Sequence, residues 1–162
     1  MMMQDRHKIP ITILICDDDE DDRMLTQQAL ERAHISNALR FTVDGEDLLD
    51  YLHQRGAYAG ETGEAPRPGL ILLDLNMPRM GGREALKQIK GDPSLKDIPI
   101  VVLSTSSADE DIVRSYQMGV NSFISKPVTF TGLVEAMQVL GRYWLEIVEL
   151  PPTAGSLLPD AM

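Results

Sequence analysis

Short apolar runs alternate along this chain with segments whose apolar residues recur at helical spacing. The runs are rich in Ile, Val and Leu, and they span residues 11–16, 38–43, 70–75, 98–104 and 121–125. Runs of this length, separated by helical patterns, are typical of strands that a parallel sheet buries on both faces. The pattern therefore predicts five parallel strands, each followed by a helix.

The helical segments carry apolar residues three and four positions apart, which gives each segment one apolar face. They are marked by Met24, Leu25, Ala29, Leu30 and Ala33, by Leu48, Leu49 and Leu52, and by the stretches 84–90, 109–118 and 130–148. Strands and helices in alternation predict right-handed crossovers and helices on both faces of the sheet. We expect an α/β, flavodoxin-like, doubly wound fold, with a five-stranded parallel sheet in the order 2-1-3-4-5.

One ordered domain is expected over residues 11–148, between an N-terminal tail at 1–10 and a C-terminal tail at 149–162. The second tail contains three prolines and no periodicity, so it is predicted to be disordered. Residues 56–69 hold four glycines and two prolines and predict a long surface loop. Because about a dozen residues follow the last predicted helix, too few for a DNA-binding module, we expect output through protein contacts.

Charge and cysteine content narrow the class of protein. The formal net charge of −10 disfavours nucleic acid and anionic membrane surfaces as partners, and no apolar run is long enough to span a bilayer. Cys16 is the single cysteine, so no internal disulfide can form and the reducing cytoplasm is expected. We interpret Cys16 as a small buried hydrophobe rather than a redox switch.

Polar residues end four of the apolar runs, and their chemistry is complementary. They are the pair Asp17-Asp18, then Asp74, Ser104 and Lys126. The carboxyl ends of parallel strands share one edge of a sheet, and ligands bind there. We therefore expect three carboxylates, a hydroxyl and an ammonium group to meet at that edge.

Three gathered carboxylates repel one another unless a cation lies among them. Oxygen donors without Cys or His indicate a hard cation, Mg²⁺ first and Mn²⁺ as an alternative, with the backbone carbonyl near Asn76 as a further ligand. The acids 19–22 are interpreted instead as helix N-terminal residues that the helix dipole stabilises. An EF-hand loop is excluded, because Asp22 occupies the position that requires glycine.

A carboxylate beside such a cation can act as a covalent nucleophile toward phosphorus. In that case Asp74 would form an aspartyl phosphate while the metal neutralises charge that develops on the phosphoryl oxygens. Lys126 would pair with the same oxygens, and Ser104 would donate a hydrogen bond to one of them.

With these motifs the chain resembles the response-regulator receiver domains of two-component signalling. The resemblance covers roughly residues 11–148 and rests on the acid pair 17–18, the run DLNMPxMxG at 74–82, the serine at 104 and the Lys-Pro pair at 126–127. It implies that Asp74 is the phosphoacceptor, that Asp18 and Asp74 ligate Mg²⁺ directly, and that Asp17 acts largely through water. The backbone carbonyl of Asn76 would be a further ligand of the metal.

The resemblance also implies how a phosphoryl group is sensed. Lys126 would contact it and precede a cis peptide bond to Pro127. Ser104, where Thr is frequent, would move toward the phosphoryl group, and Phe123, where Tyr is frequent, would rotate inward. The face made by the fourth helix, the fifth strand and the fifth helix would then change shape. Asn76 and Ser106 would flank the path of the hydrolytic water and set the lifetime of the phosphorylated state.

Within the family, the chain resembles the stand-alone regulators of phytochrome-type histidine kinases. The shared runs include LDLNMPRMGGRE at 73–84, GVNSFISKPV at 119–128 and RYWLEIVELP at 142–151. This implies a histidine kinase as phosphodonor, a downstream protein or phosphotransfer partner, and a homodimer through the changing face. Val139, Tyr143 and Leu150 lie off the apolar stripe of the last helix, which indicates a second contact surface there.

Two other classes of protein share part of this pattern. A phosphatase or phosphotransferase of the haloacid-dehalogenase type usually carries a general acid two residues after its nucleophile, and that position is Asn76 here. A binding module that no longer uses phosphate is disfavoured by the intact acids and by Lys126. We expect a signalling protein that catalyses only its own phosphorylation and dephosphorylation, not an enzyme.

Overall fold

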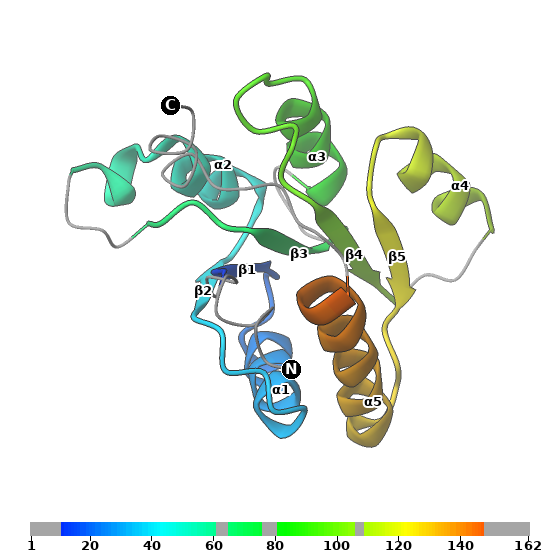
Figure 1. The fold of residues 1–162 in the computed structure, drawn as a ribbon. Coiled ribbons are helices and arrows are strands. Elements are labelled where there is room, and N and C mark those ends of the chain that lie inside the picture. The colour runs from blue at the N-terminus through cyan, green and yellow to red at the C-terminus, as the bar shows by residue number, and fades with distance from the viewer. Residues whose placement is uncertain (1–10, 61–64, 76–80, 106–108, 148–162) are drawn as a thin grey trace.

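The computed structural model describes residues 11–60, 65–75, 81–105 and 109–147. A five-stranded sheet with the order β2-β1-β3-β4-β5 lies at its centre (Figure 1). The strands are β1 Ile13–Cys16, β2 Leu39–Thr42, β3 Leu70–Asp74, β4 Ile100–Ser104 and β5 Ser122–Ser125. All four neighbouring pairs are parallel, so the predicted topology is confirmed.

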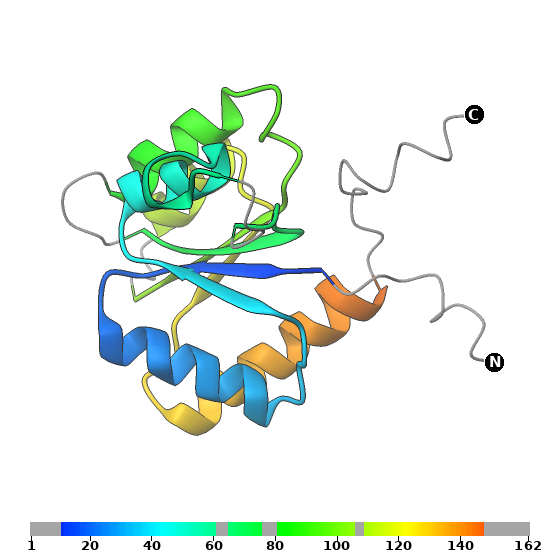
Figure 2. The ribbon, with the colours of Figure 1, turned by 90° about the vertical axis from the view of Figure 1, so that its left-hand side faces the viewer.

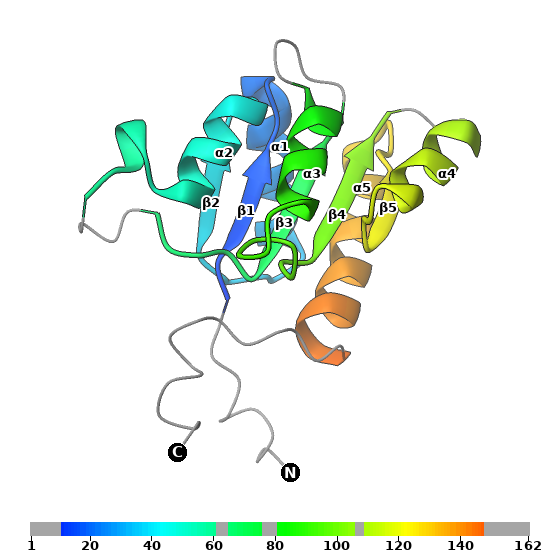
Figure 3. The same cartoon turned by 90° about the horizontal axis from the view of Figure 1, so that it is seen from above.

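Helices cover both faces of the sheet, as a doubly wound fold requires. They are α1 Glu20–Arg32, α2 Gly45–His53, α3 Gly82–Lys90, α4 Asp109–Gln117 and α5 Phe130–Leu140. Figure 2 shows α1 and α5 on one side of the sheet and α2 and α3 on the other, and Figure 3 shows α4 beside β5 on the side of α3. In the parts of the chain that the structure describes, no helix combines the length and apolar character that crossing a bilayer requires.

The central strands are buried on both faces, because alternate side chains enter two separate cores. Leu14, Leu73 and Val102 point toward α2 and α3, whereas Ile15 and Leu72 point toward α1 and α5. Every residue of β1, β3 and β4 is buried, and the edge strands β2 and β5 are mostly half-buried. The apolar runs therefore predicted strand burial correctly where strands are central.

The apolar face predicted for the first helix is wrong at its beginning. Met24 and Leu25 are 52% and 42% exposed, and the buried residues of α1 are Thr26, Ala29 and Leu30. Each residue advances about 100° around a helix, so positions 26, 29 and 30 share one face and position 24 lies well away from it. The polar Thr26 is therefore buried in the core, where the apolar spacing predicted Met24 and Leu25.

The last helical segment continues to Ile147, although it is not one uniform α-helix. After Leu140 the chain forms the π-helix η3 Gly141–Ile147, a form that usually occurs within or beside α-helices. A Cβ atom at Gly141 would lie 3.0 Å from the Cδ1 atom of Ile35, so glycine lets the α1–β2 connection pack closely here. Trp144 is 8% exposed and completes the core, as its place on the apolar stripe predicted.

The described ends of the loop before β3 are held against α2. The Tyr51 hydroxyl donates to the Pro66 carbonyl at 2.8 Å, and the Gln54 amide donates to the Ala65 carbonyl at 3.0 Å. Tyr58, in the short 3₁₀ helix η2 Gly56–Tyr58, donates its hydroxyl to Asp47 at 2.8 Å. The predicted surface loop is thus anchored at both ends by side chains of α2 and of its C-cap residue Gln54.

Candidate functional site: an acidic pocket at the strand ends

Strand register brings the predicted site residues to one edge of the sheet. Cys16 pairs with Leu73 across β1 and β3, so the next residues along the two strands, Asp17 and Asp74, lie side by side. Ser104 pairs with Ser125 across β4 and β5, which places Lys126 directly beyond them. A parallel sheet therefore builds this cluster from four separate segments of sequence.

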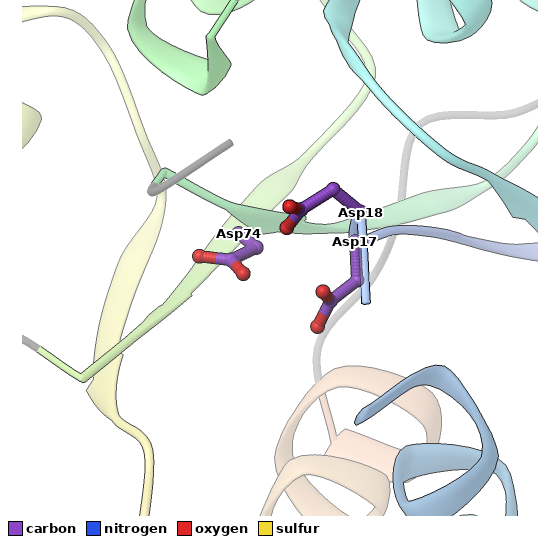
Figure 4. Close-up of side chains that lie close together, drawn as sticks. All are labelled: Asp17, Asp18 and Asp74. Carbon is purple, nitrogen blue, oxygen red and sulfur yellow. The ribbon is translucent and has the colours of Figure 1, made fainter. Parts of the chain in front are cut away.

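Three carboxylates meet at this edge. One oxygen from each of Asp17, Asp18 and Asp74 lies within 4.8 Å of the other two, and Figure 4 shows the three side chains gathered where β1 and β3 end. Asp17 and Asp74 are 3% and 8% exposed, whereas Asp18 is exposed. The acidic pocket made by these two buried carboxylates and one exposed carboxylate therefore reaches the protein surface at Asp18.

The local turn after β1 directs these acids into the pocket. Asp17 accepts a hydrogen bond from the Asp19 amide at 3.0 Å, and Arg23 donates to the Asp17 carbonyl at 2.7 Å. Asp19 is the N-cap of α1 and accepts from the amides of Asp21 and Asp22. The acids 19–22 therefore begin the helix, as predicted, and the pair 17–18 remains available for the pocket.

Lys126 is the cation of the pocket. Its Nζ atom lies 3.1 Å from Asp17, 3.7 Å from Asp22 and 3.8 Å from Asp74, and its side chain is 12% exposed. Burial lowers the pKa of the ammonium, but the carboxylates of Asp17 and Asp74 outweigh burial, so the pKa lies above its usual value. Lys126 therefore stays charged and partly neutralises the gathered acids.

One detail implied by the resemblance is wrong in this structure. The peptide bond between Lys126 and Pro127 is trans, not cis. The two isomers of a bond before proline differ by only about 0.5–1 kcal/mol, so neighbouring contacts decide which is formed. Here the Lys126 amide donates to the Ser104 carbonyl at 2.7 Å in the trans arrangement.

The residues predicted to sense the phosphoryl group lie on the neighbouring strands. Ser104 is 1% exposed at the end of β4, and Phe123 is half-buried in β5 against the core on the α2–α3 side. The Phe123 amide donates to the Tyr116 hydroxyl of α4 at 3.2 Å. Asn76 and Ser106, predicted to set the lifetime of the phosphorylated state, lie outside the described residues.

Three contacts of the site were not predicted from the sequence. Asp22 pairs with Lys126, Arg23 holds the Asp17 carbonyl, and Tyr116 links α4 to the Phe123 backbone. A local spacing signal for Asp22 was lacking, because its partner Lys126 lies far away in the sequence and the two meet only in the folded chain. Arg23 and Tyr116 gave no such signal either, because their partners are backbone atoms.

The donor set fits a hard divalent cation. Among the described residues, the possible metal ligands of the pocket are the carboxylates of Asp17, Asp18 and Asp74. Lys126 contacts three carboxylates, and Asp18 adds a fourth negative charge beside Asp17 and Asp74, so one ammonium leaves an excess of negative charge. Mg²⁺ and Mn²⁺ prefer such oxygen ligands and retain some water, which the exposed position of Asp18 allows.

Comparison with known families identifies the class. The model of the response regulator receiver domain matches residues 13–138. This chain therefore belongs to the response regulator receiver domain family, and the predicted resemblance is confirmed. Among curated proteins, it is 40% identical over 149 residues to the response regulator Rcp1 of Synechocystis, which covers 92% of this chain and 99% of that protein.

Three solved response regulators, one of them a cyanobacterial phytochrome response regulator, are similar to this chain over their whole length. The phosphorylated cyanobacterial regulator RcpA has a TM-score of 0.80 at 40% identity, covering 89% of this chain and 100% of that one. RPA3017, a regulator in red light signalling of R. palustris, has a TM-score of 0.83 at 36% identity, covering 90% and 100%. The Mn²⁺-bound form of Rcp1 has a TM-score of 0.78 at 40% identity, covering 88% and 100%. The predicted likeness to regulators of this group is confirmed.

Proposed function

We propose that this protein is a signalling switch whose Asp74 accepts a phosphoryl group from a histidine kinase in a Mg²⁺-dependent reaction. The observation that carries the proposal is the meeting of the three carboxylates with Lys126 at the ends of β1, β3 and β5. Two similar proteins support it, since RcpA is known in a phosphorylated form and Rcp1 in a Mn²⁺-bound form.

Asp18 and Asp74 would hold the cation directly, Asp17 through water, and Asn76 through its backbone carbonyl. When bound, Mg²⁺ supplies positive charge that offsets the phosphoryl oxygens. An Asp74 oxygen forms the new bond to phosphorus as the bond from phosphorus to the kinase histidine nitrogen breaks, and its electron pair returns to the imidazole. Lys126, already 3.8 Å from Asp74, is placed to neutralise the transferred group.

The phosphorylated state is transient because water can attack the phosphorus and release Asp74 as a free carboxylate. Asn76 and Ser106 would set the rate of this step, so the protein catalyses only its own phosphorylation and hydrolysis. We expect Asn76→Asp or Ser106→Ala to change the half-life of the phosphorylated protein, measured by its decay after the donor is removed. Unchanged half-lives in both variants would contradict this assignment.

The phosphoryl group adds about −1.5 to −2 charges, to which Ser104 and Lys126 respond. Movement of Ser104 would make room for Phe123 to rotate inward, and the Tyr116 hydroxyl would carry that change from β5 to α4. The face made by α4, β5 and α5 is the output surface in this proposal. The partners would be a histidine kinase of the phytochrome type in the cytoplasm and a downstream protein or phosphotransfer domain, in keeping with the regulators to which the chain is similar.

The same face is proposed to form a homodimer. Tyr116 of α4, Val139 of α5 and Tyr143 of η3 are 49%, 65% and 50% exposed, which leaves large apolar groups of these helices uncovered. Val139→Asp should raise the dimer dissociation constant by at least about tenfold, because an interface would then bury an unpaired charge. Analytical ultracentrifugation measures this constant.

The matched control is Met24→Asp on α1. Met24 is also exposed, at 52%, and this variant should leave the dimer dissociation constant within twofold of the wild-type value. A wild-type protein that stays monomeric at high concentration, or equal weakening by both substitutions, would contradict the proposed dimer face.

Lys126→Ala should bind Mg²⁺ about three- to tenfold more tightly than the wild type, because the acids lose the ammonium that competes with the cation. Lys126→Arg keeps the charge and should bind Mg²⁺ within about twofold of the wild type. Isothermal titration calorimetry gives both affinities. Weaker Mg²⁺ binding by Lys126→Ala would contradict the assignment of the pocket as the metal site.

The function itself is tested with acetyl phosphate and Mg²⁺, followed by intact-protein mass spectrometry. We expect one phosphoryl group per chain, its loss in EDTA, and slow return of the unmodified mass after the donor is removed. A protein that stays unmodified with both acetyl phosphate and a phosphorylated histidine kinase would contradict the proposal.

A further inference from the structure

We infer that Asp22 is a positioning residue that restrains Lys126 and thereby opposes occupation of the pocket by a phosphoryl group. This inference rests on the proposed function. The nearest carboxylate to Lys126 Nζ is Asp17, at 3.1 Å, and beyond it Asp22 and Asp74 lie at similar distances of 3.7 and 3.8 Å. A helix residue and the proposed phosphoacceptor therefore attract the same ammonium group about equally. To pair with a phosphoryl group on Asp74, Lys126 must give up part of its attraction to Asp22.

The position of Asp22 is fixed by the start of α1. Its backbone amide donates to the Asp19 carboxylate at 3.2 Å, so the helix cap determines where its side chain begins. Asp22 does not belong to the carboxylate group whose ligand atoms come together, which among the described residues consists of Asp17, Asp18 and Asp74. Asp22 forms its ion pair with Lys126, so its role is separable from metal binding.

The two ends of this ion pair differ in exposure. The Asp22 side chain is 43% exposed, whereas that of Lys126 is 12% exposed. A half-exposed carboxylate is solvated when its partner moves away, so the pair can open, and its charge still repels phosphoryl oxygens. Ion pairs near the surface change equilibria by up to about fivefold, and an effect of about two- to fivefold is therefore expected.

The direction of the effect separates this role from a merely structural one. Removing the Asp22 charge should strengthen binding of a phosphoryl group, because Lys126 is released toward Asp74 and a source of repulsion is lost. The same change should leave Mg²⁺ binding unchanged or weaken it by up to about twofold, since one nearby negative charge is lost. A substitution that merely damaged the pocket would weaken both.

The experiment measures the affinity of the full chain for beryllofluoride, a non-covalent mimic of the phosphoryl group, at saturating Mg²⁺, and separately for Mg²⁺ alone. Asp22→Asn should bind beryllofluoride about two- to fivefold more tightly. Asp21→Asn is the matched control, because Asp21 is exposed and carries the same charge in the same helical turn, whereas the ion pairs of Lys126 are with Asp17, Asp22 and Asp74. Asp22→Glu should retain most of the wild-type behaviour.

Unchanged or weaker beryllofluoride binding by Asp22→Asn, or an equal gain in Asp21→Asn, would overturn the inference. If thermal melting shows that Asp22→Asn is unstable, Asp22→Ser removes the same charge and should show the same gain in beryllofluoride affinity. A different result would contradict the proposed function: a wild-type chain that binds neither Mg²⁺ nor beryllofluoride. Wild-type binding that Asp22→Asn leaves unchanged overturns only the role of Asp22.

Discussion

Asp74→Asn is expected to abolish phosphorylation, with a rate at least about a thousandfold below that of the wild type, because the amide lacks the nucleophilic oxygen. Asparagine has nearly the shape of aspartate and fits the same buried place at the end of β3, where Asp74 is 8% exposed. Removing one of three neighbouring negative charges also lessens repulsion with Asp17 and Asp18. The variant should therefore be at least as stable as the wild type without Mg²⁺.

Phosphorylation by acetyl phosphate, followed by intact mass, gives the rate, and thermal melting gives the stability. Asp21→Asn serves as control, since it makes the same chemical change on an exposed carboxylate and should keep phosphorylation within about twofold of the wild type. Wild-type phosphorylation of Asp74→Asn would mean that another residue is the phosphoacceptor.

Gly82→Ala is expected to destabilise the fold and to disturb the site together. A Cβ atom at Gly82 would lie 2.5 Å from the Asp74 carbonyl oxygen and 2.8 Å from the Leu75 Cα atom, both backbone atoms that a rotamer change cannot move. The start of α3 must then shift away from the end of β3. Such overpacking typically costs about 1–3 kcal/mol, and the displaced strand end should also slow phosphorylation of Asp74 several-fold.

Gly91→Ala is the control for this prediction. Gly91 ends α3 with a φ of −88°, and its nearest contact would be the Lys87 carbonyl at 3.3 Å. This variant should change the free energy of unfolding by less than about 1 kcal/mol and leave phosphorylation unchanged. Denaturant unfolding measures both variants. Equal stabilities for Gly82→Ala and the wild type would show that the start of α3 does not pack closely against the Asp74 backbone.

The sheet and the pocket could be predicted from the sequence for one physical reason. Parallel strands buried on both faces need continuous apolar runs, and the residues that end such runs must meet at one edge. Cys16 beside Leu73 and Ser104 beside Ser125 show that the actual register does this. The family resemblance added roles to these residues, and the matching of the family model confirms the family itself.

Other features depend on packing that the sequence pattern does not contain. Met24 and Leu25 have core-like spacing, yet the cap at Asp19 and the contacts of α1 leave them exposed. The change from α- to π-helix after Leu140 has no counterpart in the apolar stripe, which continues to Trp144. The side-chain contacts of the site could not be predicted either, because the distance between two charged groups is known only once the chain has folded.

The central claim is that Asp74 receives the phosphoryl group, and the identity of the modified residue tests it most directly. The protein is phosphorylated by a histidine kinase in Mg²⁺, treated with borohydride, which converts an aspartyl phosphate to homoserine, and mapped by peptide mass spectrometry. The account predicts homoserine at position 74, dependent on both kinase and Mg²⁺. Homoserine at position 17 or 18, with Asp74 unchanged, would contradict it.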